Sequence, residues 1–259
     1  MIHGHHRSRA RFEDPVHTVF RCVNKLYSMW LQATYPFASS GRNLSIHVPC
    51  ELSRRIAHQI KLGNSVLIRK GTWFNIVPGL DRELKIIIDD NCVIGRRNSI
   101  SAKNSIHIER NVILSNSVLI HDHAHAFEDI TLPISAQGVT PGGRIRIEEG
   151  CWIGNGSSII CNAGELVIGR NSVVGAEAVI TKSVPPYSVV VGNPGRVVKH
   201  FDLTKQVWVD GPARSMGTEL PRQVCGKTCP TRSPQCAAHR QGAEGHSAVY
   251  FNTQETTNG

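Results

Sequence analysis

A repeat of six residues runs through the middle of the chain and limits what it can fold into. Aliphatic residues stand six positions apart in one unbroken series: Ile88, Ile94, Ile100, Ile106, Val112 and Val118. The spacing returns in two shorter series, at Ile147, Ile153 and Ile159 and then at Ile168, Val174 and Ile180. Six residues turn an α-helix through about 600°, so an α-helix cannot keep these side chains on one face.

The spacing predicts a parallel β-helix of triangular cross-section. Each hexad supplies one short strand and a corner, three hexads close a coil, and coils stack about 4.8 Å apart. The aliphatic side chains point inward. We expect about five coils in a domain at 39–202, with a three-residue bulge in Cys161–Glu165, where the step from one aliphatic residue to the next is nine. An extension at 1–38 precedes it, and a low-complexity tail at 203–259, expected to be disordered, follows.

The repeat stops between Val118 and Ile147, and this interruption predicts a loop at 121–144. Long loops on a regular scaffold usually carry function. The loop begins with IHDHAHAFED, in which His121, His123 and His125 alternate with other residues. Alternating histidines suit a metal site, a general base or a solvated strand edge, and the loop alone leaves these three open.

Composition narrows the partners. Of the 259 residues, 40% are hydrophobic and 19% are charged, which predicts a globular domain with a sizeable core. The formal net charge of +9 suits an anionic partner, such as a membrane surface or a polyphosphate ligand. Nucleic acid is excluded as the expected partner, because no recognition-helix pattern or basic stripe with aromatics occurs. The scattered cysteines and the lack of a long apolar run favour a reducing, cytoplasmic location.

Several motifs resemble those of one family. They are Asp122–His125 with Phe127–Asp129, the segment Cys151–Gly154, the segment Val173–Lys182 (VVGAEAVITK), Pro185–Ser188 and Gly192–Val197. Together with the hexads, they make the chain resemble the left-handed β-helix acyltransferases, the hexapeptide-repeat family, and within it the bacterial sugar and polysaccharide O-acetyltransferases. The resemblance covers roughly residues 40–200. Ala126 departs from it, since many relatives have glycine there.

The resemblance implies an acetyl-CoA-dependent O-acetyltransferase that acts on a sugar or glycan hydroxyl, assembled as a homotrimer. It implies a loop histidine as general base and direct acyl transfer. His125, seven residues after Val118, is expected to be the base, with His123 as runner-up and Glu128 or Asp129 to orient the ring. The expected coenzyme A contacts are Trp152, Gly154, Gly175, Ala176, Thr181, Lys182, Arg196 and Lys199. The expected acceptor contacts are Asn98, Ser101 and Asp122.

Other hypotheses stay open. The same fold supports N-acetylation of a xenobiotic or an amino sugar, a metal-dependent hydratase of the γ-carbonic-anhydrase type, and a non-catalytic scaffold. No metal is expected, since alternate histidines on one strand leave a tetrahedral set incomplete. Cys225, Cys229, Cys236 and His239 have zinc-ligand side chains but irregular spacing. Residues 15–35 predict an amphipathic helix that either caps the first coil or lies on an anionic membrane.

Overall fold

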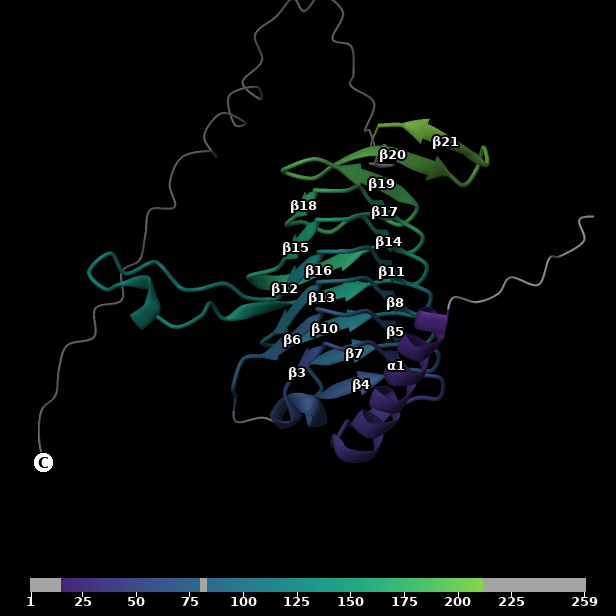
Figure 1. Cartoon of the computed structure of the whole chain (residues 1–259). Helices are drawn as coiled ribbons and strands as arrows, with labels where there is room; N and C mark the ends of the chain where they lie inside the picture. Colours follow the sequence, from purple (N-terminus) through teal and green to yellow (C-terminus); the bar gives the residue numbers. More distant parts are fainter. Residues whose placement is uncertain (1–14, 80–82, 212–259) are drawn as a thin grey trace, which may run out of the picture. The chain divides into compact units, whose positions relative to one another are not determined.

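A computed structural model of the chain describes residues 15–79 and 83–211, and these residues form a parallel β-helix preceded by one α-helix (Figure 1). The chain visits three sheets in a fixed order, here called sheets A, B and C. Sheet A contains β1 (Ser39–Ser40), β4 (Ile60–Leu62), β7 (Ile86–Ile88), β10 (Ser105–Ile108), β13 (Gly142–Ile147) and β16 (Ala163–Ile168). Sheet C contains β3 (Glu51–Leu52), β6 (Trp73–Ile76), β9 (Ser99–Ala102), β12 (Leu119–His121), β15 (Ser158–Ile160) and β18 (Val179–Ile180).

Sheet B is longer because it also includes the end of the domain. It contains β2 (Ser45–Ile46), β5 (Leu67–Ile68), β8 (Val93–Ile94), β11 (Ile113–Leu114), β14 (Trp152–Ile153), β17 (Val173–Val174), β19 (Ser188–Val191), β20 (Arg196–Asp202) and β21 (Val207–Asp210). Strands β1 to β18 pair in parallel and make six coils, so the predicted fold is confirmed with one coil more than expected. The last two strands pair antiparallel.

Aligned aliphatic side chains fill the prism. In sheet B, main-chain pairing stacks one column of inward-facing residues, all buried: Ile46, Ile68, Ile94, Leu114, Ile153 and Val174. Sheets A and C supply similar columns. Backbone hydrogen bonds link each coil to the next, and the columns exclude water from the interior, so each coil depends on its neighbours.

The unbroken six-residue series contains a shift that the sequence hides. The pairing partners of Ile88, Ile94 and Ile100 in the next coil are Ile108, Leu114 and Ile120. The corner between β9 and β10 therefore holds two extra residues. Ile106, Val112 and Val118 are also buried, but they occupy a different position in their hexads, so counting in sixes beyond Ile100 is out of register by two.

Helix α1 (Pro15–Thr34) packs beside β2, as the amphipathic pattern predicted. Ser28 and Leu31, on the inner face of the helix, are buried, and the Ser28 hydroxyl accepts the Ile46 N–H at 2.8 Å. At the other end, the hairpin β20–β21 runs through position 203, where the tail was expected to begin. The remaining tail, with its four zinc-type side chains, lies outside the described residues.

Two neighbouring residues of β11 should differ sharply in how much their substitution lowers the free energy of unfolding. Leu114 is 1% exposed and Ile113 is 48% exposed. Leu114→Ala should lower the free energy of unfolding by about 2–5 kcal/mol, because it opens a cavity in the column. Ile113→Ala should change it by less than about 0.5 kcal/mol. Urea unfolding of both variants measures the difference, and equal losses would contradict the assignment of inward and outward faces.

Candidate functional site

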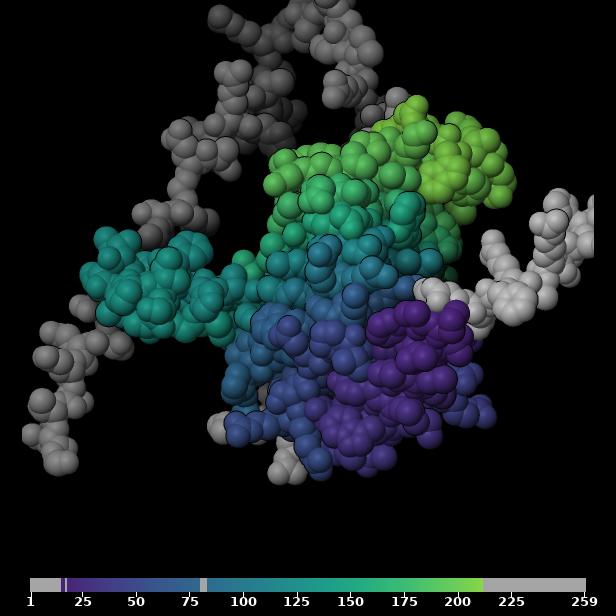
Figure 2. Space-filling model, viewed as in Figure 1, coloured from purple at the N-terminus to yellow at the C-terminus, as the bar shows by residue number. Residues whose placement is uncertain are grey.

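The interruption in the repeat forms a projecting arm, residues 122–141, which leaves the solenoid at the edge where sheet C leads into sheet A (Figures 1 and 2). Its two limbs are joined at the base, where the Thr140 N–H donates to the Ala124 carbonyl at 2.8 Å and His125 forms a β-bridge with Val139. Near the tip, the Gln137 side chain is hydrogen-bonded to both the N–H and the carbonyl of Asp129. The arm is thus internally braced, and it includes the short 3-10 helix η2 (Ile134–Ala136).

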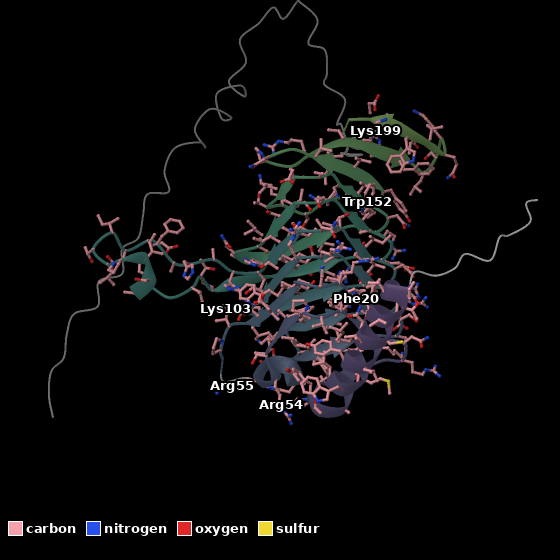
Figure 3. All side chains as sticks on the ribbon, viewed as in Figure 1. Phe20, Arg54, Arg55, Lys103, Trp152 and Lys199 are labelled. Atoms are coloured by element: carbon pink, nitrogen blue, oxygen red, sulfur yellow. The ribbon has the colours of Figure 1, made fainter. Side chains whose placement is uncertain are left out.

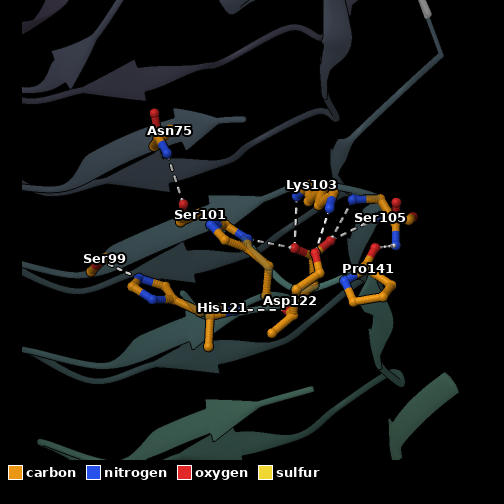
Figure 4. Close-up of polar contacts among 12 residues, drawn as sticks. Asn75, Ser99, Ser101, Lys103, Ser105, His121, Asp122 and Pro141 are labelled. Carbon is orange, nitrogen blue, oxygen red and sulfur yellow. Dashed lines mark hydrogen bonds and ion pairs between the residues drawn. The ribbon is translucent and has the colours of Figure 1, made fainter. Parts of the chain in front are cut away.

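The fully buried carboxylate of Asp122 anchors the arm to the coil below (Figure 4). It accepts hydrogen bonds from the N–H groups of Lys103, Asn104 and Ser105 at 2.6, 2.8 and 2.9 Å. Lys103 and Asn104 are the two residues between β9 and β10, and Ser105 is the first residue of β10. The ammonium group of Lys103 also donates to the Thr140 carbonyl, so the same corner holds both limbs of the arm.

Asp122 also orients His123. The imidazole Nδ1 lies 2.9 Å from Asp122 Oδ1, and the His123 side chain is only 11% exposed. Donation from Nδ1 to the carboxylate fixes the tautomer and leaves Nε2 as an acceptor. His125, the expected base, is exposed, and Glu128 accepts the N–H of its neighbour Phe127. Within the described residues no hydrogen bond joins Glu128 or Asp129 to a histidine, so the orienting carboxylate is Asp122.

His121 belongs to the same cluster. Its Nε2 lies 2.8 Å from the Ser99 hydroxyl, and its ring stacks on His123 with centroids 6.1 Å apart. Trp73 meets it edge to face at 6.4 Å from two coils below. Burial first, and then the neighbouring His123, lower the pKa of His121 below its usual value of 6.5. Sequence spacing did not indicate Trp73 or Ser99, because they reach His121 only through stacking of the coils.

The expected acceptor residues have structural roles. Asn98 is buried; its side-chain carbonyl accepts the Val118 N–H at 2.7 Å and its amide donates to Gly95. Ser101 is buried and accepts from the Asn75 side chain at 2.9 Å. Asp122 is fully buried by its hydrogen bonds to the preceding coil, so none of the three expected acceptor residues faces an open surface. The polar surface beside the histidines is made instead by Trp73, Asn75 and Ser99 on the outer face of sheet C.

The expected donor residues fall into two groups, which border opposite edges of sheet C. Gly154, Gly175 and Ala176 follow β14 and β17, where sheet B leads into sheet C. An ideal Cβ on Gly154 would lie 2.6 Å from Ala176 N, so the coils approach too closely there for a side chain. Trp152, on β14, is 52% exposed, and its indole N–H donates to the Ser115 hydroxyl.

The second group lies beyond β18, at the edge from which the arm also leaves. Thr181, Lys182 and Arg196 line a cleft of about 160 Å³. Lys199 lies on β20 and does not line this cleft; its ammonium group is 3.5 Å from the Asp210 carboxylate (Figure 3). The structure therefore brings together three of the four residues expected to contact phosphates.

Two further findings concern metals and membranes. Among residues 15–79 and 83–211, no group of three histidine, cysteine, aspartate or glutamate side chains is arranged to hold a metal ion. Within the same residues, no helix has both the length and the apolar character needed to cross a bilayer.

Known proteins resemble this chain in part. It is 32% identical over 165 residues to a probable acetyltransferase, Rv3034c, of Mycobacterium tuberculosis, covering 63% of this chain and 50% of that protein. It is 26% identical over 129 residues to WbbJ of Escherichia coli K12, which by name is a lipopolysaccharide biosynthesis O-acetyl transferase. This match covers 48% of this chain and 64% of WbbJ. The chain thus spans half to about two thirds of the length of these relatives. No family model matches it.

Among solved structures, the chain resembles a variant of AntD, an N-acyltransferase from Bacillus cereus in complex with dTDP-4-amino-4,6-dideoxyglucose and coenzyme A. The TM-score is 0.56 at 21% identity, over 67% of this chain and 89% of that one. This likeness concerns the fold.

The environment of His121 predicts its titration. An NMR titration of the imidazole protons should give His121 a midpoint below 6.5, because burial and the neighbouring ring disfavour its charged form. In His123→Gln the midpoint should rise, since one source of positive charge is removed, yet it should stay below 6.5 because the burial remains. An unchanged midpoint in this variant would show that the two rings do not interact.

Proposed function

We propose that this chain is an acetyltransferase of the hexapeptide-repeat family that transfers the acetyl group of acetyl-CoA to a hydroxyl of a sugar or glycan. One observation carries the proposal. At the edge where sheet C leads into sheet A, a histidine oriented by a buried carboxylate lies two coils from a cleft lined by lysine and arginine. Two coils correspond to about 10 Å, a span that an extended pantetheine arm can bridge.

His123 acts as the general base. Its Nε2 takes the proton of the acceptor hydroxyl while the hydroxyl oxygen attacks the thioester carbonyl carbon. The tetrahedral intermediate collapses by breaking the carbon–sulfur bond, and the imidazolium returns its proton to the leaving sulfur. The products are the acetyl ester and free coenzyme A. Asp122 stabilises the imidazolium and keeps Nε2 directed outward. Because the acceptor hydroxyl attacks the thioester directly, no acyl-enzyme is formed.

The phosphates of the donor bind at the end of the solenoid. Lys182 and Arg196 supply positive charge in the cleft, and Thr181 supplies a hydroxyl donor. Gly175 and Ala176 leave the main chain open to the pantetheine arm at the opposite edge of sheet C, next to Trp152, whereas Gly154 is buried and lets the two coils approach closely beneath them. Because sheet C separates these residues from the cleft of their own subunit, they would face the pantetheine arm that runs from a neighbouring subunit's cleft to its His123, so a groove lined by both groups requires two subunits.

The acceptor binds on the outer face of sheet C. Trp73 offers an apolar face on which a sugar ring can stack, and Asn75 and Ser99 offer polar groups beside it. A hydroxyl acceptor suits the Asp122–His123 pair, since a hydroxyl must lose its proton to attack, whereas a neutral amine attacks unaided. Transfer to the amine of an amino sugar remains the second candidate, and identification of the product as ester or amide separates the two.

A homotrimer would complete the site. The arm carries exposed apolar side chains that its own subunit does not cover: Phe127, Ile130, Leu132 and Ile134. We propose that each arm packs on the neighbouring subunit and closes the donor groove there. Apolar surface of this kind is a common mark of an interface between subunits.

The trimer has a direct test in solution. Light scattering should give a mass three times 28.5 kDa. Ile130, at the tip of the arm, is 96% exposed in the single chain. Ile130→Asp should shift the mass to that of one chain and abolish turnover, while the circular dichroism spectrum of the solenoid stays unchanged. A stable single chain that still turns over substrate would refute the shared groove.

We also propose a peripheral contact with the cytoplasmic face of an anionic membrane through residues 15–35. Helix α1 exposes a row of large apolar side chains: Val16, Val19, Phe20, Val23, Leu26, Met29 and Trp30. No aspartate or glutamate occurs between Pro15 and Cys50. An amphipathic helix with these features suits an interfacial position on a bilayer.

Two histidine variants test the mechanism. His123→Ala should lower kcat by roughly 10²–10⁴, or about 3–5 kcal/mol of barrier, because the proton acceptor is lost. His125→Ala, which removes a nearby exposed imidazole, should cost less than about tenfold. Free thiol released from acetyl-CoA in the presence of a panel of sugars provides the measurement, with chelator added as a control against the hydratase.

A larger loss of kcat in His125→Ala than in His123→Ala would identify His125, the position counted from Val118, as the base. Full activity in both would remove base catalysis from this loop altogether. Absence of thiol release in the wild-type chain with every sugar and glycan tried would favour the scaffold.

A further inference from the structure

The bulge at residues 161–165 lies between the histidine cluster and the cleft that is lined by lysine and arginine. Along the edge where sheet C leads into sheet A, the arm follows β12, the bulge follows β15, and cleft-lining residues follow β18. Neighbouring coils are about 4.8 Å apart. A donor that reaches along this edge from the cleft to His123 must therefore cross the coil that carries the bulge.

The floor of this path is a column of side chains on the outer face of sheet C. His121 pairs with Ile160 in the next coil. Ile159 pairs with Ile180, which precedes Thr181 in the chain. The column thus runs from His121 over Ile160 to Thr181, and Ile160 is partly exposed while its neighbour Ile159 is fully buried. An aliphatic side chain in the middle of the column suits the methylene carbons of an extended donor arm.

The bulge forms a wall beside this column and is fixed to the arm. The Cys161 N–H donates to the His121 carbonyl at 3.0 Å, and the Gly143 N–H donates to the Cys161 carbonyl at 3.1 Å. The first two residues of β13, at the base of the arm's return limb, pair with Ala163 and Gly164. The bulge therefore continues the wall of the arm by one coil toward the cleft.

On its other side the bulge leads into β16, which is tied to the cleft. The Val167 N–H donates to the Ser183 hydroxyl at 3.0 Å, and Ser183 lines the cleft. Gly164 has a φ of +69°, and an ideal Cβ on it would meet nothing within 4 Å, so glycine serves the turn there and its outer side is open. Hydrogen bonds thus set the position of the bulge relative to both the histidines and the cleft.

We propose that the bulge binds the pantetheine arm of the donor, an inference that rests on the acetyl transfer proposed above. Residues 162–165 are all exposed, and Asn162 stands at the root of the bulge, two positions after Ile160. An asparagine side chain both donates and accepts hydrogen bonds, which suits the amide groups of pantetheine. Ile160 packs against the methylene carbons, and Asn162 bonds to an amide. The bulge thereby holds the thioester at the level of His123.

Two donors separate contacts with the pantetheine arm from contacts with the phosphates, because acetylpantetheine has the arm but no phosphate. Asn162→Ala should raise KM about three- to tenfold for acetyl-CoA and for acetylpantetheine alike, since both lose the same hydrogen bond. Lys182→Gln should raise KM for acetyl-CoA only. Thr204→Ala, in the exposed turn between β20 and β21, is the control and should change neither value. Thiol release measures all four chains.

Deletion of residues 162–164 is the stronger test, because it shortens the step from Ile159 to Ile168 from nine residues to six. Both KM values should rise at least about tenfold while the circular dichroism spectrum stays unchanged. If the deletion variant does not fold, Asn162→Ala decides alone.

The inference is overturned if the wild-type chain releases thiol and these variants leave both KM values unchanged, or raise only the value for acetyl-CoA. A wild-type chain that binds coenzyme A but acetylates no acceptor would instead refute the proposed reaction. Calorimetric titration with coenzyme A would then still test the bulge, because Asn162→Ala should weaken that binding about three- to tenfold and an equal affinity would overturn the inference.

Discussion

Every coil of this protein is held mainly by its neighbours. Most strands are two to four residues long, and their hydrogen bonds run to the coils above and below. In the described part of the chain, the interior is a stack of aliphatic columns without gaps, and a polar side chain such as Asn98 is buried there because it hydrogen-bonds to the main chain. Extra residues therefore cannot be absorbed within a strand and must leave at a corner. Such a scaffold places function at its edges.

The insertions all leave at the same edge, where sheet C leads into sheet A. Along this edge lie, in chain order, the 3-10 helix η1 (Arg54–Gln59), residues 77–79 after β6, the two extra residues before β10, the arm and the bulge after β15. The two inserted residues and the first residue of β10 direct three N–H groups toward Asp122, and Asp122 in turn holds the arm and His123. One insertion thus serves as the foundation for another in the next coil.

The sequence predicted what depends on local periodicity and missed what depends on stacking. Coils three to six follow from the hexads, but η1 and the longer connection after β6 break the spacing in the first two coils, so the expected number of coils was one too low. Ile106 and Ile108 are both buried. Counting in steps of six from Ile88 therefore reached Ile106, another buried residue, although the residue that pairs with Ile88 in the next coil is Ile108. The motif at 122–125 pointed to the loop that carries the histidine cluster. The burial of Asp122 and the contact of Trp73 with His121 arise between coils and leave no local signal.

Asp122 joins stability to the chemistry proposed for His123. Burying a carboxylate costs several kcal/mol unless hydrogen bonds replace its water, and here three N–H groups and an imidazole do so. Because the three N–H groups belong to the solenoid, the carboxylate cannot turn to follow a mobile histidine. His123 must instead conform to the rigid coil. A base set in this way keeps its position relative to sheet C whatever the arm contacts.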